Sequence, residues 1–126
     1  MQIIITLAGK SKRFYKAGYN KPKFILELRD KTILEQVVSM FDTTNDDFYF
    51  VLNKEQDKEF PEIANFLKKI VNKSNLILID THDKGPNFSA LQVKNIIKDD
   101  GLIISYCDFF VRWNYSRFKR DVYGYD

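Results

Sequence analysis

Four short apolar runs, separated by segments with helical spacing, constrain the fold of this chain more than any other feature. The runs are rich in β-branched and aromatic residues and cover residues 3–7, 48–52, 76–79 and 102–106. Each run is continuously apolar rather than alternating, which is typical of strands covered on both faces. Strands that alternate with helices favour a parallel sheet. The sequence therefore predicts an α/β fold with an open, mainly parallel sheet flanked by helices.

The segments between the runs carry apolar residues at helical spacing. Thr32 and Glu35 form a capping-box pair ahead of the first stripe, and Pro61 is compatible with the first turn of the second. Residues 114–123 predict a short C-terminal helix. The three stripes are Ile33, Leu34, Val37, Val38 and Phe41; Phe60, Ile63, Leu67, Ile70 and Val71; and the less regular Phe88, Leu91, Ile96 and Ile97.

Length and composition indicate one globular domain over residues 1–126. Hydrophobic residues make up 44% and aromatic residues 15%. No apolar run approaches the roughly 20 residues of a membrane span, and the start predicts a strand rather than an export signal. A single cysteine, Cys107, fits a reducing compartment. We therefore expect a cytoplasmic protein, with Cys107 as a small core residue.

The first apolar run leads into a turn of small residues with a basic cluster. Ala8, Gly9 and Ser11 allow a ligand to approach backbone N–H groups, and nearby cations add positive charge. The net charge is only +3, so this positive field is local and suits a small anionic ligand such as a polyphosphate. The cations that precede the first acidic residue are Lys10, Lys12, Arg13, Lys16, Lys21 and Lys23.

Two familiar phosphate motifs do not fit this turn. A P-loop needs a glycine five residues before Gly9, and Ile4 stands there inside the apolar run. The dinucleotide fingerprint would place its third glycine at Phe14. A plain turn with solvated lysines remains the structural alternative.

Two further features fall at the same edge of the predicted sheet. Gly85-Pro86-Asn87 follows the third apolar run, and Asp108 follows the fourth. Ligands of open parallel sheets bind beyond the carboxyl ends of the strands, where these features and the Gly9 turn converge. Asp108 is a hard oxygen ligand suited to Mg²⁺ beside phosphates. The sole histidine, His82, lacks a catalytic or zinc-binding partner pattern and is expected to be a solvated loop residue.

Together these motifs resemble the signatures of the nucleotidyltransferases that activate sugar phosphates and small phosphorylated alcohols. The order Leu7-Ala8-Gly9, Ser11, Arg13-Phe14 and Pro22-Lys23 resembles their nucleotide-binding loop, with Ser11 where the family usually has glycine. The segment from Gly85 through Ser89 resembles their second signature, and Asp108 their metal-binding aspartate. The resemblance implies the N-terminal, Rossmann-like part of a GT-A-like domain.

The resemblance also implies a reaction and a role for each residue. A nucleoside monophosphate passes from an NTP to a phosphorylated acceptor, and pyrophosphate is released. Arg13 then holds the β- and γ-phosphates, Lys23 reaches the α-phosphate, and Asp108 holds Mg²⁺. The resemblance favours CTP over UTP and dTTP as the nucleotide. It also implies a role in surface polysaccharide synthesis. The implied nucleotide-binding set is Leu7, Ala8, Gly9, Lys10, Ser11, Lys12, Arg13, Lys23, Gly85, Pro86 and Ser89.

The resemblance covers only the nucleotide-binding half of the family's domain. We expect the acceptor-binding half and its usual second metal-binding aspartate to lie outside this chain, and the unfinished sheet edge to invite self-association. Two alternatives remain open. One is a non-catalytic nucleotide-binding or regulatory domain; the other is a nucleic-acid-binding module that uses the chain's two basic-aromatic segments, among them residues 112–120.

Overall fold

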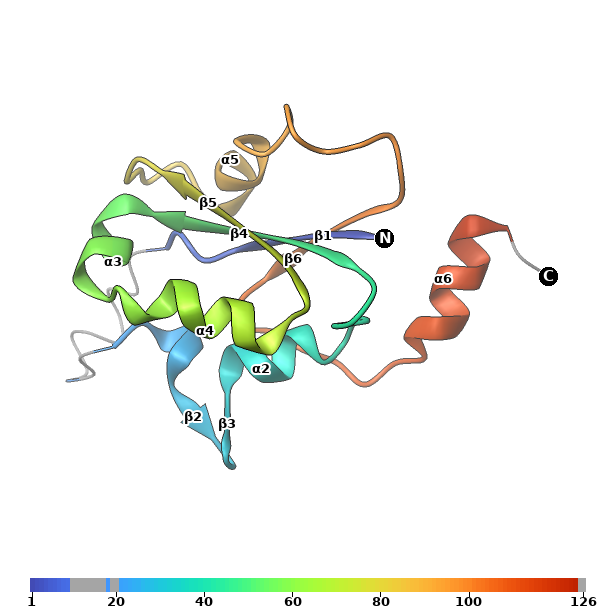
Figure 1. Ribbon diagram of the computed structural model, residues 1–126, viewed down its shortest axis with the longest axis horizontal. Coiled ribbons are helices and arrows are strands. Elements are labelled where there is room, and N and C mark those ends of the chain that lie inside the picture. The colour runs from blue at the N-terminus through green and yellow to red at the C-terminus, as the bar shows by residue number, and fades with distance from the viewer. Residues whose placement is uncertain (10–17, 19–20, 125–126) are drawn as a thin grey trace.

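A four-stranded parallel sheet forms the centre of the molecule, which we describe from a computed structural model covering residues 1–9, 18 and 21–124 (Figure 1). The strand order is β5-β4-β1-β6, and all three pairings are parallel. The predicted open parallel sheet is therefore confirmed. The strands are β1 (Gln2–Thr6), β4 (Asp47–Asn53), β5 (Lys73–Ile79) and β6 (Leu102–Tyr106).

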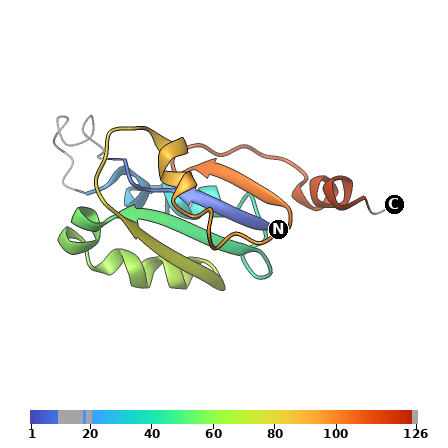
Figure 2. The same ribbon diagram turned by 90° about the horizontal axis from the view of Figure 1, so that it is seen from above.

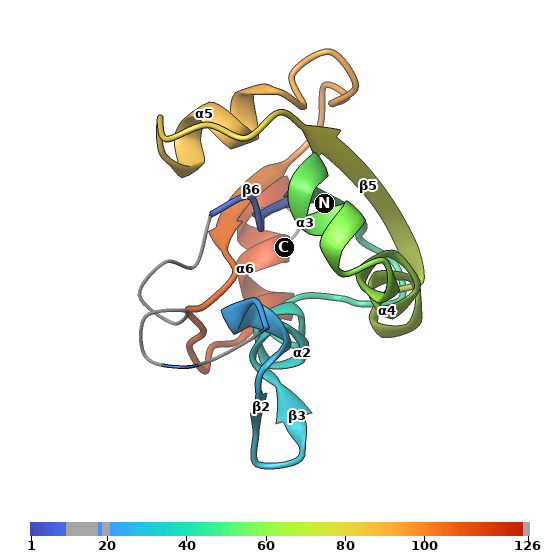
Figure 3. The same ribbon diagram turned by 90° about the vertical axis from the view of Figure 1, so that its left-hand side faces the viewer.

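Helices cover both faces of this sheet, as predicted (Figure 3). Helices α2 (Ile33–Val38), α3 (Lys54–Glu59) and α4 (Glu62–Ile70) lie on one side, and α5 (Pro86–Leu91) lies on the other. The larger core, under α2 and α4, contains Ile3, Ile5, Leu34, Val37, Phe48, Phe50, Ile63 and Leu67. The smaller core, under α5, contains Ile4, Tyr49, Val51, Ala90 and Val93.

Local hydrogen bonds explain where α2 and α3 begin. The capping box is present, since Glu35 N donates to Thr32 Oγ1 over 3.1 Å and Thr32 N donates to Glu35 Oε1 over 3.2 Å. Helix α3 was not predicted because its sequence is polar throughout and has no apolar stripe. Asn53 caps it by accepting a hydrogen bond from Gln56 N.

The third predicted helical stripe is only partly correct, because Phe88 and Ile97 are half-buried but Leu91 and Ile96 are not. Helix α5 ends at Leu91, which is 60% exposed, and Ile96 is exposed as well. The face turned to the sheet instead carries Ser89, Ala90 and Val93. Small side chains allow a short helix to lie close to the strands, so its buried face has no large apolar residues and was invisible as a stripe.

Burial on both faces holds for the central strands but not for the edges. Strands β1 and β4 are buried almost throughout, as predicted, whereas β5 and β6 are partly exposed. On β6 the exposed residues are Leu102, Ile104 and Tyr106. They pair with Gln2, Ile4 and Thr6 and so continue the face that α5 covers, but α5 contacts β1 and leaves β6 open.

The chain between η1 and α2 forms a small hairpin that projects from the sheet (Figure 3). It follows the 3-10 helix η1 (Lys23–Ile25) and consists of β2 (Glu27–Leu28) and β3 (Lys31–Thr32). The turn residues Arg29 and Asp30 both have positive φ, at 55° and 71°, which a tight two-residue hairpin connection requires.

In the described part of the chain, no helix has the length and apolar character needed to cross a membrane.

Helix α6 (Tyr115–Tyr123) confirms the predicted C-terminal helix and lies beyond the N-terminal ends of the strands (Figure 2). Its aromatic residues are used in packing. Phe41 makes edge contacts with Trp113 and Tyr115 at ring distances of 6.3 and 5.6 Å, and Phe118 lies against Trp113 at 4.8 Å. This packing favours an amphipathic helix over a platform for stacked bases.

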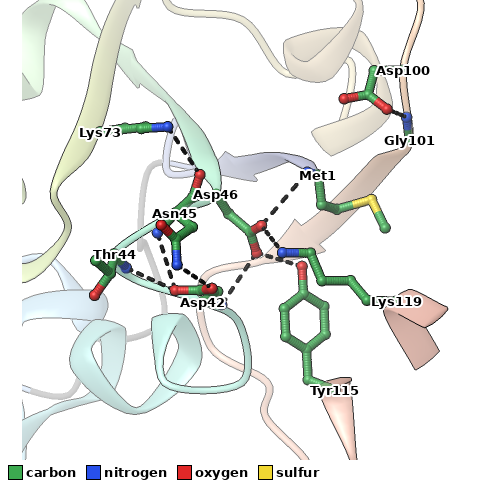
Figure 4. Close-up of polar contacts among 10 residues, drawn as sticks. All are labelled: Met1, Asp42, Thr44, Asn45, Asp46, Lys73, Asp100, Gly101, Tyr115 and Lys119. Atoms are coloured by element: carbon green, nitrogen blue, oxygen red, sulfur yellow. Dashed lines mark hydrogen bonds and ion pairs between the residues drawn. The ribbon is translucent and has the colours of Figure 1, made fainter. Parts of the chain in front are cut away.

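A buried carboxylate anchors α6 to the sheet (Figure 4). Asp46 is fully buried just before β4, and Lys119 Nζ lies 2.7 Å from its Oδ1. The Tyr115 hydroxyl donates to Oδ2, as does the backbone N–H of Asp42 over 3.1 Å. The α-amino group of Met1 lies 3.6 Å from Oδ1. A buried charge persists only with such compensation, so these groups fix α6 in place.

We predict that Tyr115→Phe destabilises the protein by about 1.5–3 kcal/mol, because it removes a hydrogen bond to a buried charge. Urea denaturation measures this loss. Tyr106→Phe is the matched control, because Tyr106 is 56% exposed. It should change the free energy of unfolding by less than about 0.5 kcal/mol. Equal stability of Tyr115→Phe and wild type would contradict the anchoring role.

The same contact predicts a dependence on alkaline pH. Burial and the hydrogen bond to Asp46 raise the pKa of Tyr115 above its usual value of 10.0. Above that pH the unfolded chain loses this proton while the folded chain keeps it, so the contribution of Tyr115 to stability falls as pH rises. Wild type should therefore lose more stability than Tyr115→Phe between neutral pH and pH 11.

Candidate functional site

A cleft of about 560 Å³ lies at the carboxyl ends of β1 and β6, where a parallel sheet is expected to bind its ligand. It contains every predicted site residue that the structure describes, while Lys10, Ser11, Lys12 and Arg13 lie outside the described residues. Segments from four parts of the chain meet here. The lining residues are Thr6, Leu7, Ala8, Gly9, Lys23, Phe24, His82, Asp83, Gly85, Pro86, Ser89, Tyr106, Cys107 and Asp108.

A larger and more open groove of about 1070 Å³ lies elsewhere, between the β2–β3 hairpin, α2 and residues 110–116. Among the predicted site residues that the structure describes, none lines this groove. It is away from the carboxyl ends of the strands, so we assign the candidate site to the smaller cleft.

An ion pair stands on one side of the cleft. Lys23 Nζ lies 2.7 Å from Asp108 Oδ2, and the two side chains are 28% and 43% exposed. Lys23 is held at this position because the next residue, Phe24, is buried in the core. Asp108 follows β6 after Cys107. The pair thus offers, side by side, an ammonium for an anionic ligand and a carboxylate for a cation.

Asp108 alone represents the predicted metal site. The described part of the chain has no group of three or more His, Cys, Asp or Glu that could hold a metal ion. Mg²⁺ commonly takes one or two protein carboxylates and completes its shell with phosphate oxygens and water. A half-exposed carboxylate in a cleft, next to the ammonium group of Lys23, fits that pattern.

The loop before α5 forms the opposite side of the cleft. Gly85 has a φ of 87°, which favours glycine, and Pro86 begins the helix. Neither Asn87 nor Ser89 caps α5, because the N-cap is Gly85 without a side-chain bond. The backbone at Gly85 therefore lines the cleft. It does so in a conformation that only glycine adopts easily.

His82 lies in a loop, as expected, but its ring is only partly exposed and is held by hydrogen bonds. Its Nε2 lies 2.8 Å from Ser89 Oγ, and the backbone N–H of Lys84 donates to its Nδ1 over 3.0 Å. A neutral ring that accepts at Nδ1 carries its proton on Nε2, so His82 donates to Ser89. The ring also packs edge-on against Phe88 at 4.5 Å. Spacing gave no sign of this, because the contact exists only once the loop folds back.

Two other residues that sequence analysis missed act on the Gly9 turn. Asn53 and Gln56 donate hydrogen bonds to the backbone carbonyls of Ala8 and Gly9. The only available signal was a polar residue directly after the second apolar run. Such a residue reads as an ordinary helix cap, which Asn53 also is.

Cys107 is a core residue, as predicted, although it borders the cleft. It is 8% exposed, and burial, reinforced by the charge of Asp108, raises the pKa of its thiol to about 12. A thiol with this pKa is almost fully protonated at neutral pH and is not a nucleophile.

Comparison with known proteins gives no matching family model but several relatives. The bifunctional protein GlmU from Methanococcus maripaludis strain C7 is 29% identical over 105 residues, and its counterpart from strain C5 is 27% identical. The match covers 83% of this chain but 24% of each relative. The chain therefore spans about a quarter of the length of these curated relatives.

Solved structures share the fold. A nucleoside-diphosphate-sugar pyrophosphorylase from Vibrio cholerae has a TM-score of 0.65 at 24% identity, covering 94% of this chain and 53% of its own. The inositol-1-phosphate CTP transferase from T. maritima has a TM-score of 0.63 at 14% identity, with coverage of 85% and 43%. A UDP-glucose pyrophosphorylase bound to UDP-glucose gives 0.61 at 14% identity, with coverage of 98% and 52%. The chain thus has the fold of GT-A-like nucleotidyltransferase domains.

We predict that Cys107 resists alkylation in the folded protein. At pH 8 a thiol with a pKa of about 12 has roughly 1000-fold less thiolate than one at the usual 9.0, and burial slows access further. Iodoacetamide labelling, followed by mass spectrometry, should be slow in buffer and fast in urea. Complete labelling of the native protein within minutes would contradict the core assignment.

Proposed function

We propose that this chain is the nucleotide-binding part of a nucleotidyltransferase. The enzyme transfers a nucleoside monophosphate from an NTP to the phosphate of a sugar phosphate or another small phosphorylated acceptor, and pyrophosphate is released. The observation that carries the proposal is the composition of the cleft. One cavity of about 560 Å³ is lined by a small-residue turn, a cation, a carboxylate and a glycine loop. These four features are far apart in the sequence, and they resemble the family's motifs.

The proposed chemistry needs little proton transfer, because the acceptor phosphate is already a nucleophile. Catalysis then consists of alignment and of neutralising charge on the α-phosphate and the leaving pyrophosphate. Lys23 contributes an ammonium to the α-phosphate, and Arg13 contributes its guanidinium to the β- and γ-phosphates. The cations Lys10 and Lys12 add to the positive charge of this segment, and Ser11 adds a further small residue to its sequence.

Asp108 is the proposed ligand of Mg²⁺. When bound, this ion would withdraw charge from the phosphate oxygens. Asp108 Oδ2 lies 2.7 Å from Lys23 Nζ. Nucleotide binding in our proposal replaces this pair by two new ones, in which Lys23 meets phosphate and Asp108 meets the cation. Because both side chains are partly exposed, separating them costs little.

The base and ribose are proposed to lie between the two backbone segments of the cleft. Leu7, Ala8 and Gly9 line one side, while Gly85, Pro86 and Ser89 line the other. His82, which also lines the cleft, holds the Ser89 hydroxyl by a hydrogen bond. We propose CTP as the preferred nucleotide, and surface polysaccharide synthesis as the setting, from the sequence resemblance.

We further propose that turnover requires residues beyond this chain. The chain covers 53% of the Vibrio structure and 24% of the GlmU relatives. Strand β6 is an exposed edge on which further chain could add. The acceptor-binding half and any second metal-binding aspartate are assigned to that part.

We predict that Lys23→Ala and Arg13→Ala each weaken NTP binding by about 1.5–3 kcal/mol, the range for hydrogen bonds to charged groups. Isothermal calorimetry with CTP and Mg²⁺ measures this change. Lys73→Ala is the control, because Lys73 begins β5 at the opposite end of the sheet. Unchanged affinity in both site variants would remove this cleft from consideration.

We also predict that NTP binding depends on Mg²⁺ through Asp108. In a metal titration at fixed CTP, wild type should bind more tightly as Mg²⁺ rises, and Asp108→Asn should lose most of that dependence. Asp83→Asn is the control, since Asp83 also lines the cleft but is not in the family motif. Equal metal dependence in wild type and Asp108→Asn would show that Asp108 has only a structural role.

A further inference from the structure

Two buried amide side chains contact the turn that follows β1. Asn53 is the last residue of β4, and its Nδ2 donates to the Ala8 carbonyl over 3.1 Å. Gln56 lies in the first turn of α3, and its Nε2 donates to the Gly9 carbonyl over 3.1 Å. The two side chains belong to residues that are only 2% and 5% exposed. Both reach across from a part of the chain more than 40 residues away.

The hydrogen bonds between the two amides fix their orientation. Asn53 Oδ1 accepts from the backbone N–H of Gln56 over 2.7 Å, and Asn53 Nδ2 also donates to Gln56 Oε1 over 3.1 Å. Turning either amide by 180° would place its oxygen against a backbone carbonyl oxygen, where two acceptors repel. Each amide therefore has one satisfied arrangement, in which its N–H groups face the turn.

This arrangement replaces the sheet's own hydrogen bonding. The backbone N–H of Leu7 still donates to the Val51 carbonyl over 2.7 Å, as in a parallel ladder. Beyond that bond β4 ends at Asn53 and α3 begins, so no strand remains beside Ala8 and Gly9. The amides of Asn53 and Gln56 instead donate to the carbonyls of Ala8 and Gly9, so both acceptors are satisfied where the ladder stops.

The direction of these carbonyls sets the direction of the neighbouring N–H group. In a trans peptide the carbonyl of Ala8 and the N–H of Gly9 point in opposite directions. The Ala8 carbonyl points toward Asn53, on the β4 side of β1. The Gly9 N–H therefore points toward the other side, where β6 neighbours β1 and Asp108 follows β6. That side is the cleft.

We propose that Asn53 and Gln56 are positioning residues of the nucleotide site. By holding the carbonyls of Ala8 and Gly9 on the side of β4 and α3, they present the Gly9 N–H to the nucleotide in the cleft. The inference rests on the proposed function. The turn is fixed before the ligand arrives, so less conformational entropy is lost on binding than for a free turn of small residues.

Two nearly isosteric variants test this role. Asn53→Asp keeps an oxygen to cap α3 but has no N–H for the Ala8 carbonyl, and Gln56→Glu likewise loses its donor to the Gly9 carbonyl. Each should weaken CTP binding in the presence of Mg²⁺ about tenfold. The control is Asn75→Asp, which removes an amide-to-carbonyl bond of 3.0 Å to Phe48, away from the cleft. It should leave CTP affinity unchanged.

A second measurement separates positioning from stability alone. In wild type the backbone amide resonance of Gly9 should shift on addition of CTP and Mg²⁺, and this shift should be strongly reduced in both variants. Folded variants that bind CTP as tightly as wild type, with the same Gly9 shift, overturn the proposal even if their melting temperatures fall. Should Asn53→Asp fail to fold, Gln56→Glu decides, because Gln56 does not supply the cap. Failure of wild type to bind any NTP refutes the proposed function itself.

Discussion

The central position of β1 is the constraint on which the rest of the structure depends. This strand pairs with β4 on one side and β6 on the other and is buried on both faces. Because all pairings are parallel, the segments that leave β1 and β6 emerge at the same edge as the loop after β5. The strand order thus brings together the Gly9 turn, Asp108 and Gly85, which are far apart in the sequence.

The two ends of the sheet are stabilised in different ways. At the N-terminal end the carboxylate of Asp46 is fully buried and is compensated by Lys119, Tyr115 and backbone groups. At the carboxyl end the Lys23–Asp108 pair is partly exposed. A buried ion pair resists separation, whereas an exposed one is weak. The strongly held charge therefore anchors α6, and the weakly held pair stands where ligands are proposed to bind.

Sequence patterns predicted the parts of the molecule that are encoded in continuous apolar runs or in local motifs. The four strands, the Thr32 capping box and the helix after Asn114 all belong to this class. Helix α3 was missed because it is polar throughout, and the packing face of α5 was misassigned because it is made of small residues. The convergence of the Gly9 turn, Gly85 and Asp108 was predicted from the strand ends, but the direct pairing of Lys23 with Asp108 was not.

The missed site contacts share a physical cause. His82 is hydrogen-bonded to Ser89 within one loop. Asn53 and Gln56 donate hydrogen bonds to backbone carbonyls, whose positions cannot be predicted from residue types. Side-chain bonds to the backbone depend on where the acceptor's peptide plane lies, and one sequence carries little information on that. Such contacts became visible only when the turn, the loop and α3 were seen together.

The central claim is that one cleft holds the nucleotide, and a crystal structure of this chain with CTP and Mg²⁺ tests it most directly. Our account predicts the triphosphate between the Gly9 turn and Lys23, with the cation on Asp108 and the base against the loop from Gly85 to Ser89. A nucleotide bound instead in the groove between the β2–β3 hairpin and residues 110–116, with this cleft empty, would contradict it.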